Sequence, residues 1–274
     1  VPMTLGQEFE AWGIMVEEDM ARVREAQALI HEINMGATAI GTGLNAHPAY
    51  AALVTERLAQ VSGVPVIKAQ NLVEATQDAG AYVQLSGVLK RVAVKLSKIS
   101  NDLRLLSSGP RAGLGEINLP PMAPGSSIMP GKVNPIIPEV VNQVAFEVIG
   151  NDLTVTMAAE AGQLELNAFE PVIAYNLFTS MDMLGRACRT LAQRCVQGIT
   201  ANREHCRRMV ENSIGLVTAL NPLIGYEKSA EIAKEALATG RAVTEIALEK
   251  GYLSKEEIEE VLRPENMTRP RYRG

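Results

Sequence analysis

Apolar residues recur at alternating steps of three and four along four long segments, and this spacing constrains the fold more than any other feature. Such steps place apolar side chains on one face of an α-helix. No segment shows a convincing alternation of apolar and polar residues, which would predict a strand. The pattern therefore predicts an all-α protein built on a bundle of long helices. The four segments are residues 5–30, 85–103, about 137–161 and about 171–195.

Turn-forming residues suggest how these helices are divided into domains. Residues 107–135 are rich in glycine and proline and form the longest irregular segment. A loop of this length inside a compact domain is uncommon unless it has a function. Beyond about residue 205 the helical patterns become shorter. We expect a central helical-bundle domain at residues 1–204, with a functional loop at about 123–134, and a small C-terminal helical domain at residues 205–274.

Composition and charge exclude several classes of partner. The chain has 274 residues, 47% of them hydrophobic, and 26 Lys+Arg against 31 Asp+Glu give a net charge of −5. A chain of this composition can bury a core and is not disordered. It lacks a basic block and an apolar run long enough to span a bilayer, so we expect no nucleic acid and no membrane as partner. Three scattered cysteines and no export signal predict a cytoplasmic location.

Two short patterns match ligand-binding motifs without the context that those motifs need. Residues 41–46 fit the GxGxxA pattern of dinucleotide-binding folds, but they follow a predicted helix and have no βαβ context. Close packing around the glycines explains them better. His205 and Cys206 are adjacent, but no further ligands stand at metal-binding spacing. We therefore expect neither a nucleotide site nor a zinc site.

The segment from Gly125 to Pro135 concentrates groups that can carry chemistry. Gly125 and Gly131 allow positive φ angles and a close approach of main-chain N–H groups to a ligand. Asn134 followed by Pro135 predicts an N-cap with proline as the first helical residue, which places the positive end of a helix at the loop. Lys132 adds a full positive charge. Together these features predict a cradle for a carboxylate or a phosphate.

Ser126 and Ser127 lie beside this predicted cradle. An alcohol is a weak base near neutral pH, so a serine base would need Lys132 and the helix N-terminus to stabilise its alkoxide. On these residues alone, a solvated turn followed by a capped helix explains the segment as well.

The run GSSIMPGKVNP resembles the signature loop of the fumarase/aspartase superfamily, and the similarity extends along essentially the whole chain. Within the superfamily, residues 136–144, 157–163 and 199–202 look like the aspartate ammonia-lyases rather than the fumarases. Further blocks similar to the superfamily occur in the expected order at residues 36–45, 98–113, 163–171 and 213–222.

The resemblance implies reversible deamination of L-aspartate to fumarate and ammonia. It implies no organic cofactor and leaves activation by a divalent metal open. Ser126 matches the family residue that removes the C3 proton, and Ser127, Lys132 and Asn134 match substrate-binding positions. Lys132 would pair with the carboxylate next to the carbanion. Loss of the proton gives a dianionic enediolate, which a preorganised ammonium, an amide and N–H groups would stabilise.

Glu139 matches a family glutamate that orients an active-site histidine. In the superfamily that histidine lies in a Thr-His pair upstream of the position matching Val1, and another substrate-binding block lies earlier still. We therefore expect this sequence to lack the N-terminal domain of the family.

The resemblance also implies a homotetramer with a twenty-helix core, whose active sites are each assembled from three subunits. Glu165, Asn167 and Glu170 lie near the expected core. We interpret Glu165 and Asn167 as polar residues between helices, with direct substrate contact as the alternative. Two other functions stay open, namely a class II fumarase acting on L-malate and a non-catalytic helical assembly module.

Overall fold

Four long helices dominate the protein. A computed structural model describes residues 2–123, 129 and 131–270. Each long helix covers one of the four segments in which the apolar periodicity predicts a helix, so the all-α prediction is confirmed. These helices are α1 (Leu5–Leu29), α3 (Gly80–Leu106), α4 (Ile136–Glu160) and α5 (Glu170–Arg194).

Shorter elements join and extend the long helices. Strand β1 (Glu32–Ile33) pairs in parallel with β2 (Ile67–Lys68). Strand β3 (Ile117–Asn118) pairs antiparallel with β4 (Thr200–Ala201). Helix α2 (Tyr50–Ser62) lies between β1 and β2, and a 3₁₀ turn, η1 (Glu74–Thr76), precedes α3. The C-terminal helices are α6 (Arg203–Glu211), α7 (Val217–Ile224), α8 (Tyr226–Thr239), α9 (Val243–Glu249), α10 (Lys255–Val261) and α11 (Pro264–Met267).

Mutual packing divides the chain into two compact units. One unit comprises Ile14–Ser108 and Leu119–Ile199. The other comprises Val1–Gly13, Gly109–Asn118 and Thr200–Gly274. The predicted domain boundary after residue 204 stays a prediction.

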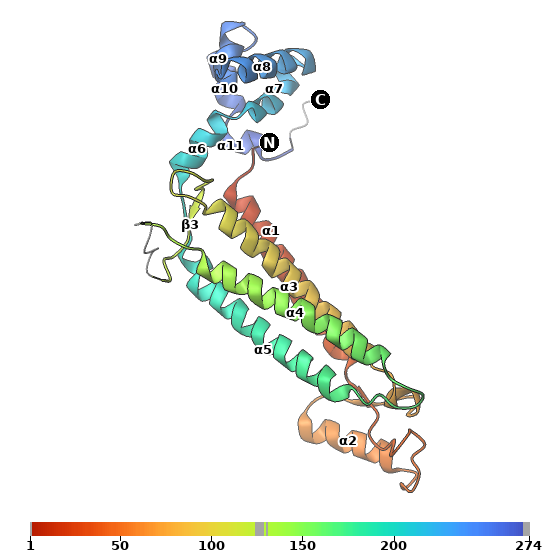
Figure 1. The fold of residues 1–274 in the computed structure, drawn as a ribbon. Helices are drawn as coiled ribbons and strands as arrows, with labels where there is room; N and C mark the ends of the chain where they lie inside the picture. Colours follow the sequence, from red (N-terminus) through yellow and green to blue (C-terminus); the bar gives the residue numbers. More distant parts are fainter. Residues whose placement is uncertain (1, 124–128, 130, 271–274) are drawn as a thin grey trace. The chain divides into compact units, whose positions relative to one another are not determined.

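Helices α3, α4 and α5 form the packed part of the first unit. Helix α4 contacts both α3 and α5, and the three run side by side (Figure 1). On each helix, buried apolar residues recur every seven positions, which is typical of the seam between bundle helices. These residues are Leu89, Leu96 and Leu103 on α3, Val141, Val148 and Val155 on α4, and Leu177, Leu184 and Leu191 on α5.

Ion pairs hold α1 against α3. The Nε atom of Arg91 donates to Oδ1 of Asp19 at 2.8 Å, and Nζ of Lys95 lies 3.1 Å from the same oxygen. Lys95 also donates to the carbonyl oxygen of Met15 at 3.1 Å. Because Asp19 is buried, its carboxylate requires these cationic partners.

Three of the long helices carry apolar side chains that this chain leaves uncovered. On α1, Val16, Met20 and Val23 belong to the predicted apolar face but are exposed. Periodicity identifies residues that share a face, and it does not show whether that face is covered. The uncovered apolar stripes, as we call them, are Val16, Met20 and Val23 on α1, Phe146, Ile149, Leu153 and Met157 on α4, and Tyr175, Phe178 and Met181 on α5.

The C-terminal helices share a separate core within the second unit. Leu220, Ile232 and Ile246 are completely buried there and come from α7, α8 and α9. Helix α10 begins with a capping box, in which the Ser254 side chain and the Glu257 backbone N–H form one of the two reciprocal hydrogen bonds. These features agree with the short helical patterns that the sequence shows beyond residue 205.

The three cysteines occupy different environments. Cys195 is buried at the C-terminal end of α5, Cys206 is half-buried and Cys188 is exposed. The helical patterns around the cysteines predict burial for all three, and this prediction is wrong for Cys188. Burial raises the pKa of the Cys195 thiol from its usual 9.0 to about 11.

We expect Cys195 to make stability fall with rising pH between about 9 and about 11. The unfolded chain releases the thiol proton near the usual value, whereas the folded chain retains it until the higher pKa. The stabilisation is therefore complete below the lower value and lost as pH rises through the upper one. Urea unfolding at about pH 8 and about pH 10.5 measures the loss, and Cys195→Ala should show a smaller one. Equal losses in both proteins would contradict this assignment.

Candidate active site

The loop that carries the predicted chemistry is described only in part. Gly125, Ser126 and Ser127 lie outside the described residues, so their predicted roles stay predictions. Gly131, Lys132, Asn134 and Glu139 are described and can be placed.

Gly131 and Lys132 form a turn at the downstream end of the loop. Gly131 has φ +82°, in the left-handed region that glycine tolerates best, as its predicted role requires. The backbone N–H of Lys132 donates to the carbonyl oxygen of Met129 at 3.3 Å. The Lys132 side chain is half-buried. A backbone hydrogen bond therefore fixes the position from which the Lys132 side chain extends.

The predicted N-cap role of Asn134 is wrong by one residue. Pro135 occupies the N-cap with φ −78° and ψ 54°, and no side-chain hydrogen bond caps the helix. These angles, with the N–H of Ile136 donating to the carbonyl oxygen of Asn134 at 2.9 Å, describe an inverse γ-turn centred on Pro135. The helix can begin only after this turn, because ψ of Pro135 lies outside the helical range. Asn134 is thus the first residue of the γ-turn.

The start of α4 brings Lys132, Asn134 and Glu139 to one end of the bundle helix. The first residues of a helix present N–H groups without partners in the helix and carry a partial positive charge. Lys132 adds its own charge four residues before the helix begins. Glu139 lies in the first turn, where a carboxylate is favourable. The arrangement can attract a carboxylate, as the sequence predicts.

The upstream end of the loop is fastened to the segment around β4, inside the second unit. Asn118 Nδ2 donates to Asn202 Oδ1 at 2.7 Å, and Asn202 Nδ2 donates to Asn118 Oδ1 at 3.1 Å. The same amide of Asn202 donates to the Gly115 carbonyl oxygen at 2.8 Å. Residues 115–118 therefore have a fixed backbone path immediately before the loop.

The adjacent pair His205 and Cys206 contributes to the same attachment. Nε2 of His205 lies 2.7 Å from the carbonyl oxygen of Leu114. The Cys206 thiol donates to the carbonyl oxygen of Glu116 at 3.6 Å. The two side chains thus contact backbone oxygens, which gives the pair a structural role.

The sequence reasoning missed Asn142, an amide buried in the second turn of α4. Val141, next to it in the chain, and Ala145, one turn further along the helix, are buried as well. A single asparagine inside an apolar pattern does not disturb the helical periodicity. The available signal was its polarity in a mainly apolar stretch of the helix, since a buried amide needs partners.

Asn167 has a different role from the one expected. Its Nδ2 donates to the carbonyl oxygens of Ala158 and Ala159 at 3.0 and 3.2 Å, and its Oδ1 accepts from the backbone N–H of Phe169 at 2.8 Å. The buried amide therefore shapes the connection between α4 and α5 rather than a polar network between helices. Glu170 begins α5 and lines a cavity described below.

The glycine-rich segment at residues 41–46 does have a parallel strand pair around it, contrary to the expectation of no βαβ context. Strands β1 and β2 enclose α2, although each has only two residues. Gly41 nevertheless faces protein rather than a ligand. A Cβ atom at Gly41, where φ is +94°, would lie 2.2 Å from Cα of Val73. Close packing therefore explains this glycine, as the sequence reasoning preferred.

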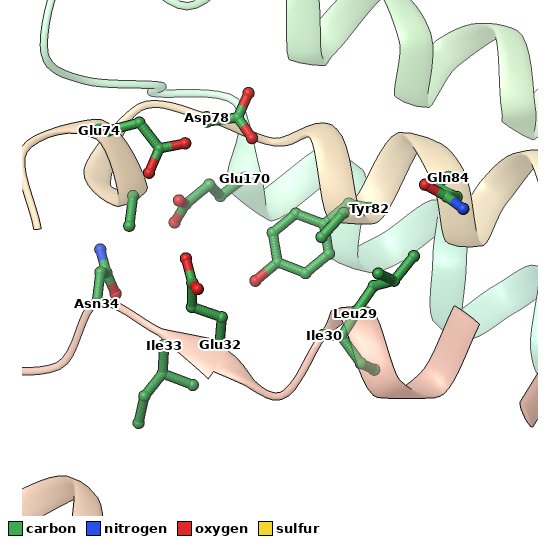
Figure 2. Close-up of a pocket in the computed structure, with 12 residues that line it drawn as sticks. Leu29, Ile30, Glu32, Ile33, Asn34, Glu74, Asp78, Tyr82, Gln84 and Glu170 are labelled. Carbon is green, nitrogen blue, oxygen red and sulfur yellow. The ribbon is translucent and has the colours of Figure 1, made fainter. Parts of the chain in front are cut away.

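A cavity of about 380 Å³ lies at the junction of α1, β1, η1, α3 and α5. Figure 2 shows the carboxylates of Glu32, Glu74 and Glu170 directed into the same space, with the Tyr82 hydroxyl beside Glu32. Burial, assisted by the charge of Glu170, raises the pKa of Tyr82. Of the predicted site residues that the structure describes, Gly131, Lys132, Asn134 and Glu139, none lines this cavity. Its acidic lining opposes a dicarboxylate, so it is not the predicted substrate site.

Two properties of the described residues bear on partners. No group of three or more His, Cys, Asp or Glu side chains among residues 2–123, 129 and 131–270 could hold a metal ion. None of the helices within the same residues combines the length and the apolar character needed to cross a bilayer.

Two family models match the chain. A model described as "Lyase" matches residues 1–150, and one described as "Fumarase C C-terminus" matches residues 216–269. Aspartate ammonia-lyase from Helicobacter pylori is 64% identical over 98% of this chain. Aspartate ammonia-lyase from Escherichia coli is 55% identical over 100% of it. The chain spans 58% and 57% of the length of these two relatives.

Solved structures agree with this similarity. A fumarate lyase:delta crystallin from Brucella melitensis, bound to cobalt, matches with a TM-score of 0.95 and 60% identity, covering 98% of this chain and 58% of that one. A class II fumarase from Schistosoma mansoni matches with a TM-score of 0.92 and 36% identity, covering 97% of this chain and 59% of that one. At these identities the likeness extends to sequence as well as to fold.

Proposed function

Because the chain belongs to the lyases of the fumarase/aspartase superfamily, we propose that it takes part in the reversible deamination of L-aspartate to fumarate and ammonia. One observation carries this proposal. Aspartate ammonia-lyases are 55–64% identical to essentially the whole chain, whereas the class II fumarase of Schistosoma mansoni is 36% identical. The blocks at residues 136–144 and 157–163 also favour aspartate over malate.

The chemistry begins with removal of the C3 proton of aspartate by Ser126. The electron pair left on C3 is delocalised into the adjacent carboxylate, which becomes a dianionic enediolate. Lys132 and the N-terminal end of α4 stabilise that charge, and Ser127 and Asn134 bind the substrate. Collapse of the enediolate forms the double bond of fumarate and breaks the C–N bond, so that the protonated amino group leaves as ammonia while Ser126 holds the C3 proton. This mechanism uses no organic cofactor.

Further copies of the same chain are the partner that would cover the uncovered apolar stripes. On α4 the stripe recurs at steps of three and four, so Phe146, Leu153 and Met157 lie along one face. A contiguous apolar face of this kind marks an interaction surface. We propose a homotetramer in which helices of neighbouring subunits cover these stripes and in which each active site combines residues of three subunits.

Parallel assays with L-aspartate and L-malate test the proposed reaction. We expect fumarate to form from L-aspartate, and its absorbance reports the rate. The chain should be assayed alone and after co-expression with the remaining part of the Helicobacter pylori relative, because it spans 58% of that protein. Turnover of L-malate alone would replace this proposal with a fumarase.

A third outcome distinguishes catalysis from assembly. If neither substrate reacts in either preparation while size-exclusion chromatography shows a tetramer, the chain is a non-catalytic assembly module. The stripes would then be the functional surface.

A further inference from the structure

Asn142 fastens the beginning of α4 to α3 through hydrogen bonds that use both ends of its amide. Nδ2 donates to the carbonyl oxygen of Ser97 at 3.1 Å and to Oγ of Ser97 at 2.9 Å. Oδ1 accepts from Nη1 of Arg104 at 3.3 Å. Asn142 is only 3% exposed, so water cannot replace these partners. Its amide therefore depends on α3.

These bonds fix the axial position of the first two turns of α4 on α3 in a way that apolar contacts do not. The apolar contribution follows the buried area and has no direction, so a small slide of one helix along another changes it little. Hydrogen bonds weaken steeply with distance and angle, and a buried amide that loses its partners pays the cost of desolvation. A slide that moves Asn142 away from Ser97 is therefore opposed.

The position of Asn142 connects this restraint to the candidate site. It lies six residues after the first residue of α4, which is about 9 Å along the helix axis. Lys132 and Asn134 precede the helix by four and two residues, and the γ-turn at Pro135 joins them to it. A shift of the helix start therefore moves both residues.

We propose that Asn142 is a positioning residue for the reaction. It holds Lys132 and Asn134 at the axial position along α3 that substrate binding requires. This inference rests on the proposed function for its effect on turnover. A displacement of about 1 Å in an active site can reduce turnover about 100-fold. We accordingly expect Asn142→Ala to lower kcat by about 10- to 100-fold.

Asn151 provides a matched control on the same helix. It is also a buried asparagine, and its Nδ2 donates across the bundle to Oγ of Ser180 on α5 at 3.1 Å. It lies nine residues further from the loop. Its neighbour Asp152, which accepts from Ser86 at 2.8 Å and from Lys90 at 2.5 Å, holds that part of α4 independently. Asn151→Ala therefore removes a comparable bond without releasing the helix start.

Hydrogen exchange of the intact chain tests the restraint without any activity. In Asn142→Ala we expect the amides of residues 131–139 to exchange about tenfold faster, while Asn151→Ala leaves them unchanged. Ser97→Ala, which retains the backbone acceptor, should give a smaller increase. Equal exchange of residues 131–139 in Asn142→Ala and wild type would overturn the proposal, as would an equal increase in both asparagine variants.

Turnover measurements test the second part of the proposal, which is the effect of Asn142 on the reaction. They are made at a temperature well below the unfolding temperature of every variant. We expect Asn142→Ala to lose kcat and Asn151→Ala to stay within about twofold of wild type. Faster exchange with unchanged kcat would overturn the positioning role. If the wild type deaminates nothing, the proposed function fails, and the exchange experiment alone decides whether Asn142 sets the position of residues 131–139.

Discussion

Ser126→Ala should lower kcat for the deamination of L-aspartate by about 10²- to 10⁴-fold, because it removes the proposed base. The Michaelis constant should change little, since Lys132 and Asn134 would still bind the substrate. Ser126 lies outside the described residues, so this expectation rests on the resemblance of the loop to the superfamily. Initial rates of fumarate formation at several aspartate concentrations separate the two constants.

Ser62→Ala is the matched control for this substitution. The Ser62 hydroxyl donates to the carbonyl oxygen of Leu58 at 2.6 Å in the last turn of α2, and Ser62 is not one of the proposed site residues. Its removal should leave kcat unchanged. A Ser126→Ala protein that remains assembled and loses less than about tenfold in kcat would remove Ser126 from the role of base.

Gly41→Ala should destabilise the fold by about 3 to 5 kcal/mol. The backbone at Gly41 is in the left-handed region, with φ +94°. The added Cβ would also lie 2.2 Å from Cα and 2.3 Å from N of Val73, and 2.4 Å from the carbonyl oxygen of Leu72. These are backbone atoms, so no side-chain rotation can relieve the contact. Urea unfolding followed by circular dichroism measures the change.

Gly63→Ala separates the cost of a left-handed backbone from the cost of the contact with backbone atoms. Gly63 ends α2 with φ +70°, and nothing lies within 4 Å of an added Cβ. It therefore carries the conformational cost alone, about 1 kcal/mol. Similar losses in both variants would show that the contact of Gly41 with Val73 is not restrictive.

The long helices were predictable because the apolar residues that each one buries recur at helical spacing in its own sequence. On α3, Leu89, Leu96 and Leu103 repeat at the spacing of a bundle seam, and all three are buried. The apolar periodicity predicted the start of α4 at about residue 137, and the helix begins at Ile136. Such patterns are local, so a single sequence is sufficient to read them.

The features that the sequence did not predict depend on partners far along the chain. Strands β1 and β2 have two residues each, too few to show an alternation of apolar and polar residues. Their pairing joins residues 32–33 to residues 67–68. Asn142 gains its importance from Ser97, 45 residues earlier. Val16 and Met20 were correctly assigned to an apolar face, but their exposure depends on what covers α1.

The helix N-terminus beside the candidate site was predictable, and the turn that precedes it was not. Lys132, Asn134 and Glu139 do adjoin a helix N-terminus. The γ-turn at Pro135 was missed because Asn-Pro is compatible with a capped helix and with a turn, and only the ψ angle of 54° separates them.

The order in which the helices follow one another has a consequence for how the bundle forms. Helices α3, α4 and α5 are consecutive and pack as neighbours, so they can associate through contacts of low sequence separation. The bond between Asp19 and Arg91 instead spans 72 residues, with α2 and both strands of the parallel pair in between. Closing that long loop costs entropy before its ion pairs are gained. We therefore expect α1 to dock only after α3, α4 and α5 have associated.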